Sequence, residues 1–246
     1  MRVIDWTASG WEELAPHVGR IRLPGWDCTT GLVAGEDAAL LIDTGSSLRE
    51  GARLRADTRR LLGPDRRVTH IALTHPHFDH VFGTAAFAGV EVYGAAGIDT
   101  VFAGGGADAL RADAVRHGLD PDLAGEAADL LVTPGHRVCG ERTLDLGGGV
   151  RVLLANVGPG HTGHDLAVLV SAPSGPEIAF CGDLVEESGE PQAGPDAAPQ
   201  RWPAALDRLL ALGGEDARYV PGHGSAVNAA FVHEQRATLA GRSGVS

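Results

Sequence analysis

Thr74-His75-Pro76-His77-Phe78-Asp79-His80 decides the fold, because four side chains that can bind a metal follow one another directly after an apolar run. Imidazole and carboxylate groups are the ligands that zinc, iron and manganese accept. The preceding residues, Ile71-Ala72-Leu73, predict a strand that ends where the histidines begin. A structural zinc site is usually closed by four ligands that include thiolates. The stretch therefore predicts a catalytic metal site on a loop that follows a strand.

Three further blocks along the chain each contain one candidate ligand. They are His161 in Gly-Pro-Gly-His-Thr-Gly-His, Asp183 in Cys-Gly-Asp-Leu, and His223 in Pro-Gly-His-Gly. Each block follows an apolar run that predicts a strand, so we expect each ligand at a strand end. Together with the first stretch they supply seven imidazole and carboxylate groups, which are enough to hold two ions.

Apolar runs and turn residues predict alternating strands and helices in both halves of the chain. The predicted strands are 20–23, 31–34, 38–42, 70–73, 91–93, 151–157, 166–171, 177–181 and 218–220. The predicted helices are 47–62, 81–88, 107–117, 203–212 and 226–239. This order favours two sheets packed face to face with helices outside, in a single domain over residues 1–246. Residues 94–135 and 188–199 interrupt the pattern and are predicted to be lid or insertion segments beside the site.

Composition limits the partners of the chain. Its 246 residues carry a net charge of −12 and contain no lysine, so a nucleic-acid partner is not expected. No apolar run approaches the length of a transmembrane helix, and no signal peptide is visible, which predicts a cytoplasmic protein that acts on a small molecule. Three cysteines without C-x-x-C spacing are read as reduced, partly buried thiols.

His-x-His-x-Asp-His, followed by single His, Asp and His ligands in this order, resembles the metallo-β-lactamase superfamily. The resemblance runs from about residue 20 to residue 239 and implies an αββα sandwich with two mixed sheets flanked by helices. It implies two divalent ions, zinc first, with iron or manganese as alternatives. By position, the first ion would be held by His75, His77 and His161, and the second by Asp79, His80 and His223, with Asp183 bridging both.

The bridging Asp183 is similar to the glyoxalase II and lactonase branch, whereas class B β-lactamases commonly lack a bridging carboxylate there. The resemblance implies that two ions share a water, lower its pKa toward ~7, and produce a hydroxide that attacks a thioester, ester or lactone. Asp79 and Asp183 would orient this nucleophile and accept its proton. Hydroxyacylglutathione is not expected as the substrate, since the chain lacks the lysine-containing extension that binds glutathione in glyoxalase II.

Several residues near these motifs have two interpretations. Asp43, in Ile-Asp-Thr-Gly, resembles the family's buried carboxylate beneath the site, or is a simple turn residue. His164 is an outer-shell or loop histidine, or an extra ligand. Trp26 either flanks the substrate or anchors its own loop. Phe78 is expected to pack beneath the ligand loop, and Cys181 to lie in a strand core.

The remaining assignments concern surface residues and a substrate anchor. His70, His117, His136 and His233 have no ligand-like context and are predicted to be surface or cap residues. With no lysine in the chain, an anionic substrate group would have to be met by an arginine such as Arg137 or Arg201, by backbone amides or by the metals.

Three other functions remain open from the sequence. One is an iron-dependent oxidoreductase such as a persulfide dioxygenase, which uses a single iron on the first three histidines. Another is a β-lactam-hydrolysing member of the same superfamily. The third is a regulatory or structural domain that keeps the ligands without catalysis. The sequence leaves the oligomeric state open.

Overall fold

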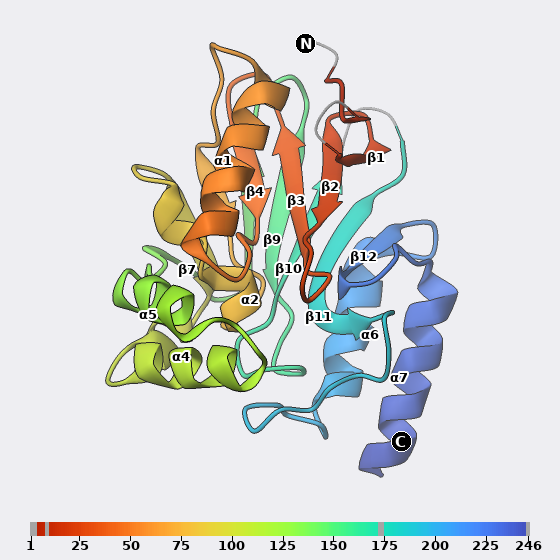
Figure 1. The fold of residues 1–246 in the computed structure, drawn as a ribbon. Helices are drawn as coiled ribbons and strands as arrows, with labels where there is room; N and C mark the ends of the chain where they lie inside the picture. Colours follow the sequence, from red (N-terminus) through yellow and green to blue (C-terminus); the bar gives the residue numbers. More distant parts are fainter. Residues whose placement is uncertain (1–3, 8–9, 172–174, 245–246) are drawn as a thin grey trace.

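The computed structural model describes residues 4–7, 10–171 and 175–244, which form two mixed β-sheets packed face to face with helices on both outer faces (Figure 1). The seven-stranded sheet runs in the order β1 (Glu12–Ala15), β2 (Val18–Arg22), β3 (Thr29–Ala34), β4 (Ala39–Ile42), β5 (His70–Ala72), β6 (Glu91–Ala95) and β7 (His136–Val138). The five-stranded sheet runs in the order β12 (Arg218–His223), β11 (Ile178–Glu186), β10 (Leu166–Ser171), β9 (Arg151–Asn156) and β8 (Glu141–Asp145). The expected two-sheet sandwich is therefore confirmed.

Each sheet changes once from antiparallel to parallel pairing of its strands. In the seven-stranded sheet, β1 to β4 are antiparallel and β4 to β7 are parallel. In the five-stranded sheet only β11 and β12 are parallel. The parallel strands require crossover connections, and helices supply them. Because parallel strands end at the same edge, the loops that follow β4, β5 and β6 gather at one end of the sandwich.

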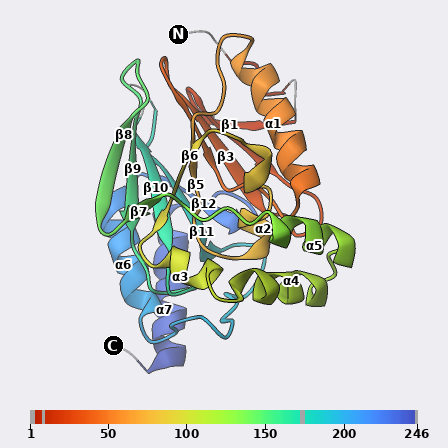
Figure 2. The same ribbon diagram turned by 90° about the vertical axis from the view of Figure 1, so that its left-hand side faces the viewer.

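Helices cover the two outer faces. The face of the seven-stranded sheet is covered by α1 (Leu48–Leu62), α2 (Phe78–Val81), the 3-10 turn η2 (Thr84–Ala86), α3 (Ile98–Phe102), α4 (Gly106–Arg116) and α5 (Pro121–Asp129). The face of the five-stranded sheet is covered by α6 (Trp202–Gly213) and α7 (Ala229–Ser243). Figure 2 shows α1 on one side of the sandwich and α6 on the other. No helix within the described ranges is long and apolar enough to cross a membrane.

Side-chain alternation along the strands builds three apolar layers. Leu40 and Ile42 of β4 point between the sheets, while Leu41 points to the helices over the first sheet. On β10, Val168 faces the other sheet and Leu169 faces α6 and α7. Each of these side chains is fully or almost fully buried, and burying one stabilises the fold by about 1.5–3 kcal/mol. The period of two along each strand therefore gives every sheet two apolar faces.

The sequence did not predict three of the strands, β1, β7 and β8. Each is the outermost strand on its side of a sheet. The sequence also made β11 too short, since it continues to Glu186 and not to residue 181. The helical periodicity of residues 107–117 is matched by α4, which is followed by the shorter α5.

Candidate metal centre

The seven predicted ligands come from both sheets and meet at one end of the sandwich. They are carried by the loop after β5 (His75, His77), by α2 (Asp79, His80), by the loop between β9 and β10 (His161), by β11 (Asp183) and by the end of β12 (His223). We expected each of the three isolated ligands at the end of a strand. This is wrong for Asp183, which lies inside β11 at a shift in the pairing with β12. Gly222 of β12 makes room for it, because a Cβ there would lie 1.8 Å from Asp183 Oδ1.

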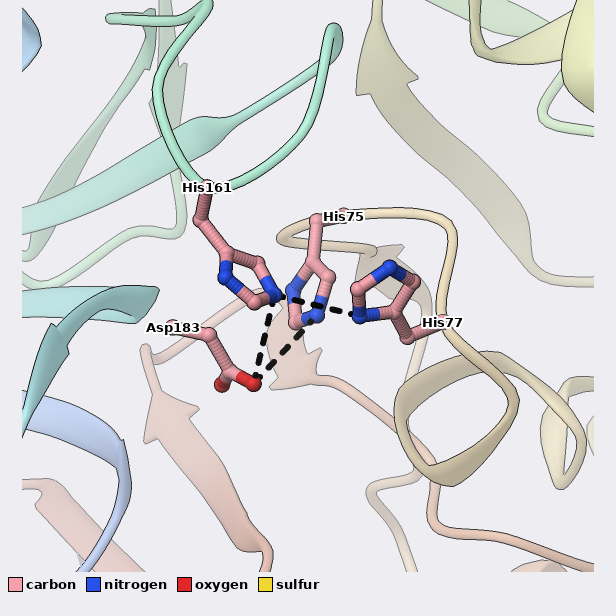
Figure 3. Close-up of side chains that lie close together, drawn as sticks. All are labelled: His75, His77, His161 and Asp183. Atoms are coloured by element: carbon pink, nitrogen blue, oxygen red, sulfur yellow. Dashed lines mark hydrogen bonds and ion pairs between the residues drawn. The ribbon is translucent and has the colours of Figure 1, made fainter. Parts of the chain in front are cut away.

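The first ligand group consists of His75, His77, His161 and Asp183, whose ligand atoms all lie within 4.8 Å of one another (Figure 3). His161 Nε2 is 3.1 Å from His77 Nδ1 and 3.6 Å from Asp183 Oδ2. His75 Nε2 is also 3.6 Å from Asp183 Oδ2. Ligands about 2.0–2.1 Å from one tetrahedral ion stand roughly 3.3 Å apart. The group therefore has the dimensions of a metal site.

The second ligand group joins His80, His223 and Asp79 to the same Asp183. His80 Nε2 lies 3.3 Å from Asp183 Oδ1 and 3.5 Å from Asp79 Oδ2. His223 Nε2 lies 3.3 Å from Asp79 Oδ2 and 3.3 Å from Asp183 Oδ2. Asp183 thus belongs to both groups and is the side chain that connects them.

Two buried polar atoms show that the centre fits cations. His75 Nε2 and Asp183 Oδ1 are both buried, and neither has a hydrogen-bond partner among the described residues. A buried polar atom without a partner costs about 1–3 kcal/mol, so such atoms are rare unless a ligand satisfies them. Both atoms point into the ligand groups. The donor set of imidazole nitrogens and carboxylate oxygens suits zinc, iron or manganese.

The protonation of the ligands also suits cations. Burial lowers the pKa of His75 well below 6.5 and that of His161 to about 4, which keeps both imidazoles in the neutral, metal-binding form. For His223, burial lowers the pKa, but the carboxylates of Asp183 and Asp79 outweigh it and raise the pKa to about 12. In the second group, a proton on His223 thus helps to balance the two carboxylates. A bound cation would replace it in this role.

Each of the five imidazoles directs one nitrogen into the centre and the other toward an oxygen outside it. These outer pairs are His75 Nδ1 with Thr74 Oγ1 (3.0 Å), His77 Nε2 with Asp196 Oδ2 (3.1 Å), His80 Nδ1 with Asp43 Oδ2 (2.9 Å), His161 Nδ1 with Gln192 O (3.1 Å) and His223 Nδ1 with Trp26 O (2.6 Å). Carbonyl and carboxylate oxygens only accept hydrogen bonds, and the Thr74 hydroxyl already donates to Asp43 Oδ2, so the outer nitrogen of each ring carries the proton. The inner nitrogen of a neutral ring then has a free lone pair for a metal.

Asp43 occupies the place that the resemblance implied, beneath the ligand loop. It follows β4 in a left-handed conformation with φ of 58°. Its carboxylate accepts hydrogen bonds from Thr74 N at 2.8 Å and Thr74 Oγ1 at 2.7 Å, in addition to its contact with His80. Asp43 thereby links the end of β4 to the start of the ligand loop and to the second ligand group.

His164 belongs to neither ligand group. Its Nδ1 lies 3.0 Å from the carbonyl oxygen of Ala96, just after β6. A Cβ on Gly97 would lie 2.5 Å from its ring. His164 therefore joins the loop that carries His161 to the start of the 94–135 segment.

Cys28 is a buried thiol whose position beside the metal centre was not predicted from the sequence. Its sulfur lies 3.2 Å from the backbone oxygen of Asp79, and 3.7 and 3.8 Å from Nδ1 and Nε2 of His80. The thiol sulfur and the ligand atoms of Asp79 and His80 all lie within 4.8 Å of one another. Burial raises the pKa of this thiol to about 11. Cys28 therefore supports the Asp79–His80 backbone as a neutral thiol.

A cavity of about 630 Å³ opens over the centre. One wall comes from residues of α4 that share a helix face, another from residues 186–196, and the floor from ligands including His77, Asp79, His161, Asp183 and His223. Both segments that interrupt the strand pattern therefore reach the cavity. Its volume lies within the range typical of small-molecule sites, roughly 300–1,000 Å³.

Two aromatic side chains line the same cavity. Trp26 packs edge-on against Phe78 with ring centroids 5.3 Å apart. Phe78 is buried, as expected, yet it also borders the cavity. His117 stacks on Phe78 from the end of α4, so this predicted surface or cap residue faces the site. Cys181 is buried within β11, against the α6 and α7 layer.

The predicted arginine anchors do not border the cavity. Arg137 pairs with Asp99, and Arg201 precedes α6. Among the described residues, the arginine that lines the cavity is Arg116, which already pairs with Asp113 at 2.5 Å. Sequence spacing could not reveal this, since Arg116 reaches the site only through the position of α4.

Comparisons with solved structures point to one fold. The chain is similar to the FIM-1 metallo-beta-lactamase from Pseudomonas aeruginosa, solved in its mono-zinc form, with 20% identity, a TM-score of 0.68 and 96% of each chain covered. It is similar to a metallo-beta-lactamase from Pontibacter korlensis, with 22% identity, a TM-score of 0.70, and 93% and 97% of the two chains covered. A metallo beta lactamase from Hirschia baltica gives 16% identity, a TM-score of 0.66, and 93% and 96% coverage.

The sequence itself matches one family model. No curated protein matches the chain significantly. Residues 23–223 match the model described as the metallo-beta-lactamase superfamily, a span that contains all seven candidate ligands. With its two-sheet fold and its ligand groups intact, the chain belongs to the metallo-beta-lactamase superfamily and is a metal-dependent hydrolase.

Proposed function

We propose that this hydrolase uses two divalent ions, zinc first, to cleave a small thioester, ester or lactone. The observation that carries the proposal is the position of Asp183, whose oxygens lie within 3.3–3.6 Å of four histidines from both ligand groups. A carboxylate shared in this way is suited to bridge two ions. His75, His77 and His161 would hold the first ion, and Asp79, His80 and His223 the second.

The protein contributes orientation, proton transfer and exclusion of water. Bound ions would lower the pKa of a shared water and polarise the carbonyl oxygen of the substrate. Asp79 borders the cavity, and although burial raises its pKa, the charges of His80 and His223 lower it more, so its carboxylate is ionised and can accept a proton. Trp26 and Phe78 form an apolar wall beside the reacting carbonyl, which favours an acyl group over bulk water at this position.

Beyond the ligands, the side chains that line the cavity include more carboxylates than cationic groups. Besides the ligands, the charged residues that line it are Asp113, Arg116, Glu186 and Asp196. Arg116 is paired with Asp113, which leaves Glu186 and Asp196 as the unbalanced charges of the rim. A neutral ester or lactone needs no cationic side chain on this rim, whereas the carboxylate or phosphate of an anionic substrate would have to be bound by the ions or by Arg116.

The second candidate function is β-lactam hydrolysis. It is favoured by the names of the structural neighbours, which are metallo-beta-lactamases, although their low identity to this chain supports the fold alone. Among the described side chains that line the cavity, Arg116 is the arginine that could hold a β-lactam carboxylate, if the ions do not. The Arg116→Ala variant would then lose β-lactam turnover and keep thioester turnover.

A side-by-side kinetic comparison tests the proposal. The zinc-loaded protein would be assayed with an aryl thioester, an aryl ester, a γ-lactone, a cephalosporin and a phosphodiester. We expect kcat/KM for a thioester or lactone to exceed the value for the cephalosporin, with no turnover of the phosphodiester. Chelation should abolish the activity, and added zinc should restore it. Cephalosporin turnover above that of the thioesters and lactones would overturn the assignment.

A further inference from the structure

We propose that Asp196 is a positioning residue for the first metal ion, acting through His77 from the loop between β11 and α6. The inference rests on the proposed two-ion function and assigns a role to a residue outside the seven ligands. Asp196 Oδ2 lies 3.1 Å from His77 Nε2, and His77 Nδ1 faces His161 in the first ligand group. A carboxylate only accepts, so this contact leaves the proton on Nε2 and the lone pair on Nδ1.

The local sequence explains why Asp196 faces His77. Gly194-Pro195-Asp196-Ala197 forms a turn closed by the hydrogen bond from Ala197 N to Gly194 O at 3.1 Å. Proline at the second position favours such a turn, because its fixed φ matches the turn geometry. The turn presents Asp196 at its third position, beside the cavity.

The same loop also contacts His161, another proposed ligand of the first ion. The carbonyl of Gln192 accepts a hydrogen bond from His161 Nδ1 at 3.1 Å. Ala198 N donates to Gly160 O at 2.9 Å, which ties the loop to the residue just before His161. The loop therefore supplies the outer partners of His77 and His161, whereas the outer partners of His80 and His223 come from Asp43 and Trp26. This division predicts that the loop acts on the first ion and not on the second.

The far side of the loop contacts the end of α7 through an exposed ion pair, which contributes little stability. Glu190 pairs with Arg242 at the end of α7, and Ser243 Oγ donates to Pro199 O at 2.9 Å. Glu190 thus lies in the same loop as Asp196 and carries the same charge, but its partner is on α7. Glu190→Gln is therefore a matched control that removes one negative charge from the loop without touching a histidine.

The test is metal binding by Asp196→Ala, Asp196→Asn and Glu190→Gln. Each protein would be loaded with ¹¹³Cd, which should give one NMR resonance per ion, and its zinc affinities would be measured by competition with a chromophoric chelator. We expect Asp196→Ala to weaken one ion by about 10–100-fold and to shift one resonance only. Asp196→Asn keeps an oxygen acceptor and should weaken that ion less. Glu190→Gln should bind both ions as the unmodified protein does.

The possible failures are distinguishable. If the unmodified protein binds fewer than two ions at full loading, the proposed two-ion function is wrong. If it binds two and Asp196→Ala binds both with unchanged affinity, or weakens both equally, the positioning role is wrong. A Glu190→Gln effect equal to that of Asp196→Ala would likewise overturn it, because loop charge alone would then explain the change. Circular dichroism of each variant checks that it is folded before metal binding is compared.

Discussion

Asp183 is the residue on which the two ligand groups depend. Its Oδ2 faces His75, His161 and His223, and its Oδ1 faces His80. Burial raises the pKa of this carboxyl, but the surrounding histidines, His80 foremost, lower it well below its usual value. The carboxylate is therefore ionised, which is the state that a bridging ligand requires.

Asp183→Ala and His77→Ala should each reduce hydrolysis to background while the chain remains folded. The variants remove a ligand of the proposed ions, but the three apolar layers are held by contacts among apolar side chains, which do not require the ions. Activity assays with circular dichroism and melting curves check this. The exposed Asp216→Ala serves as the control and should behave like the unmodified protein. A variant that cannot fold would show that the site is structural.

Asp165, just after the His161 loop, should make stability depend on pH. Burial raises its pKa to about 7, and its Oδ1 accepts from Thr162 N and Oγ1. A pKa above the unfolded value means that the folded chain binds more protons between about pH 4 and pH 7, so stability falls as pH rises through this window. The Asp165→Asn variant keeps the acceptor and should lack this contribution, which amounts to roughly 2–3 kcal/mol between pH 5 and pH 7.

Urea unfolding of the chelated protein and the Asp165→Asn variant, at pH 5 and at pH 8, measures the difference. The unmodified protein should lose more stability than the variant over this interval. Equal losses would mean that Asp165 is already ionised in the folded chain at pH 5.

At the scale of elements, α1 depends on a close backbone contact. A Cβ on Gly51 would lie 2.2 Å from the backbone oxygen of Gly83, next to η2. Ser47 caps the start of the helix, since its hydroxyl accepts from Glu50 N, and Gly63 caps its end with a positive φ of 84°. Its caps follow from local sequence, but its distance from η2 is determined by Gly51.

Gly51→Ala should therefore destabilise the fold by about 1–3 kcal/mol, although alanine is the better helix former. The matched control is Gly125→Ala in α5, where a Cβ would make ordinary contacts of 3.6–3.7 Å with Arg111. This control should stabilise the protein by up to about 1 kcal/mol. Urea unfolding of both variants gives the comparison, and a stabilised Gly51→Ala variant would contradict the close packing of α1.

The strands that sequence reasoning missed share a position as well. β1, β7 and β8 are edge strands, and three of the five residues of β8 lie exposed at its start. Edge strands bury less side-chain surface and carry more charge, so their sequences lack the apolar runs that identified the interior strands. Glu141-Arg142-Thr143 in β8 illustrates this.

At the scale of the whole molecule, the centre joins the two sheets. The first sheet supplies four ligands through the loop and helix after β5, and the second supplies three through β11, β12 and the loop before β10. Bound ions would therefore link the two halves of the sandwich. Since the sheets already share an apolar layer, this link adds stability to a fold that exists without it.

We expect two ions per chain, about 3.5–4 Å apart. Removing them should lower the melting temperature, because a ligand at 1,000 times its Kd stabilises the folded state by about 4 kcal/mol. The far-UV circular dichroism should stay native. Elemental analysis and a melting curve before and after chelation measure both quantities. A single ion at full loading would contradict the two-ion centre, and loss of secondary structure on chelation would make the ions structural.

Local sequence located the ligand blocks, and the family resemblance that these blocks carry implied the two-sheet fold. His75 to His80 lie next to one another after an apolar run, so both the strand and the candidate ligands can be read without knowing the rest of the chain. The same holds for His161 and Asp183, which lie close to or within interior strands, and for His223, which ends the mostly buried edge strand β12. Each of these patterns lies within a few consecutive residues, so it can be recognised from the sequence without the structure.

The residues that surround the centre could be identified only from the tertiary structure. Cys28 packs on His80, Asp196 contacts His77 across 119 positions, and Arg116 reaches the cavity from α4. Nothing in their own neighbourhoods marks these residues, since a lone cysteine, a turn aspartate and a helix arginine are ordinary in those places. Their roles arise from contacts between segments far apart in the chain, which form only when both sheets and their crossover helices have packed.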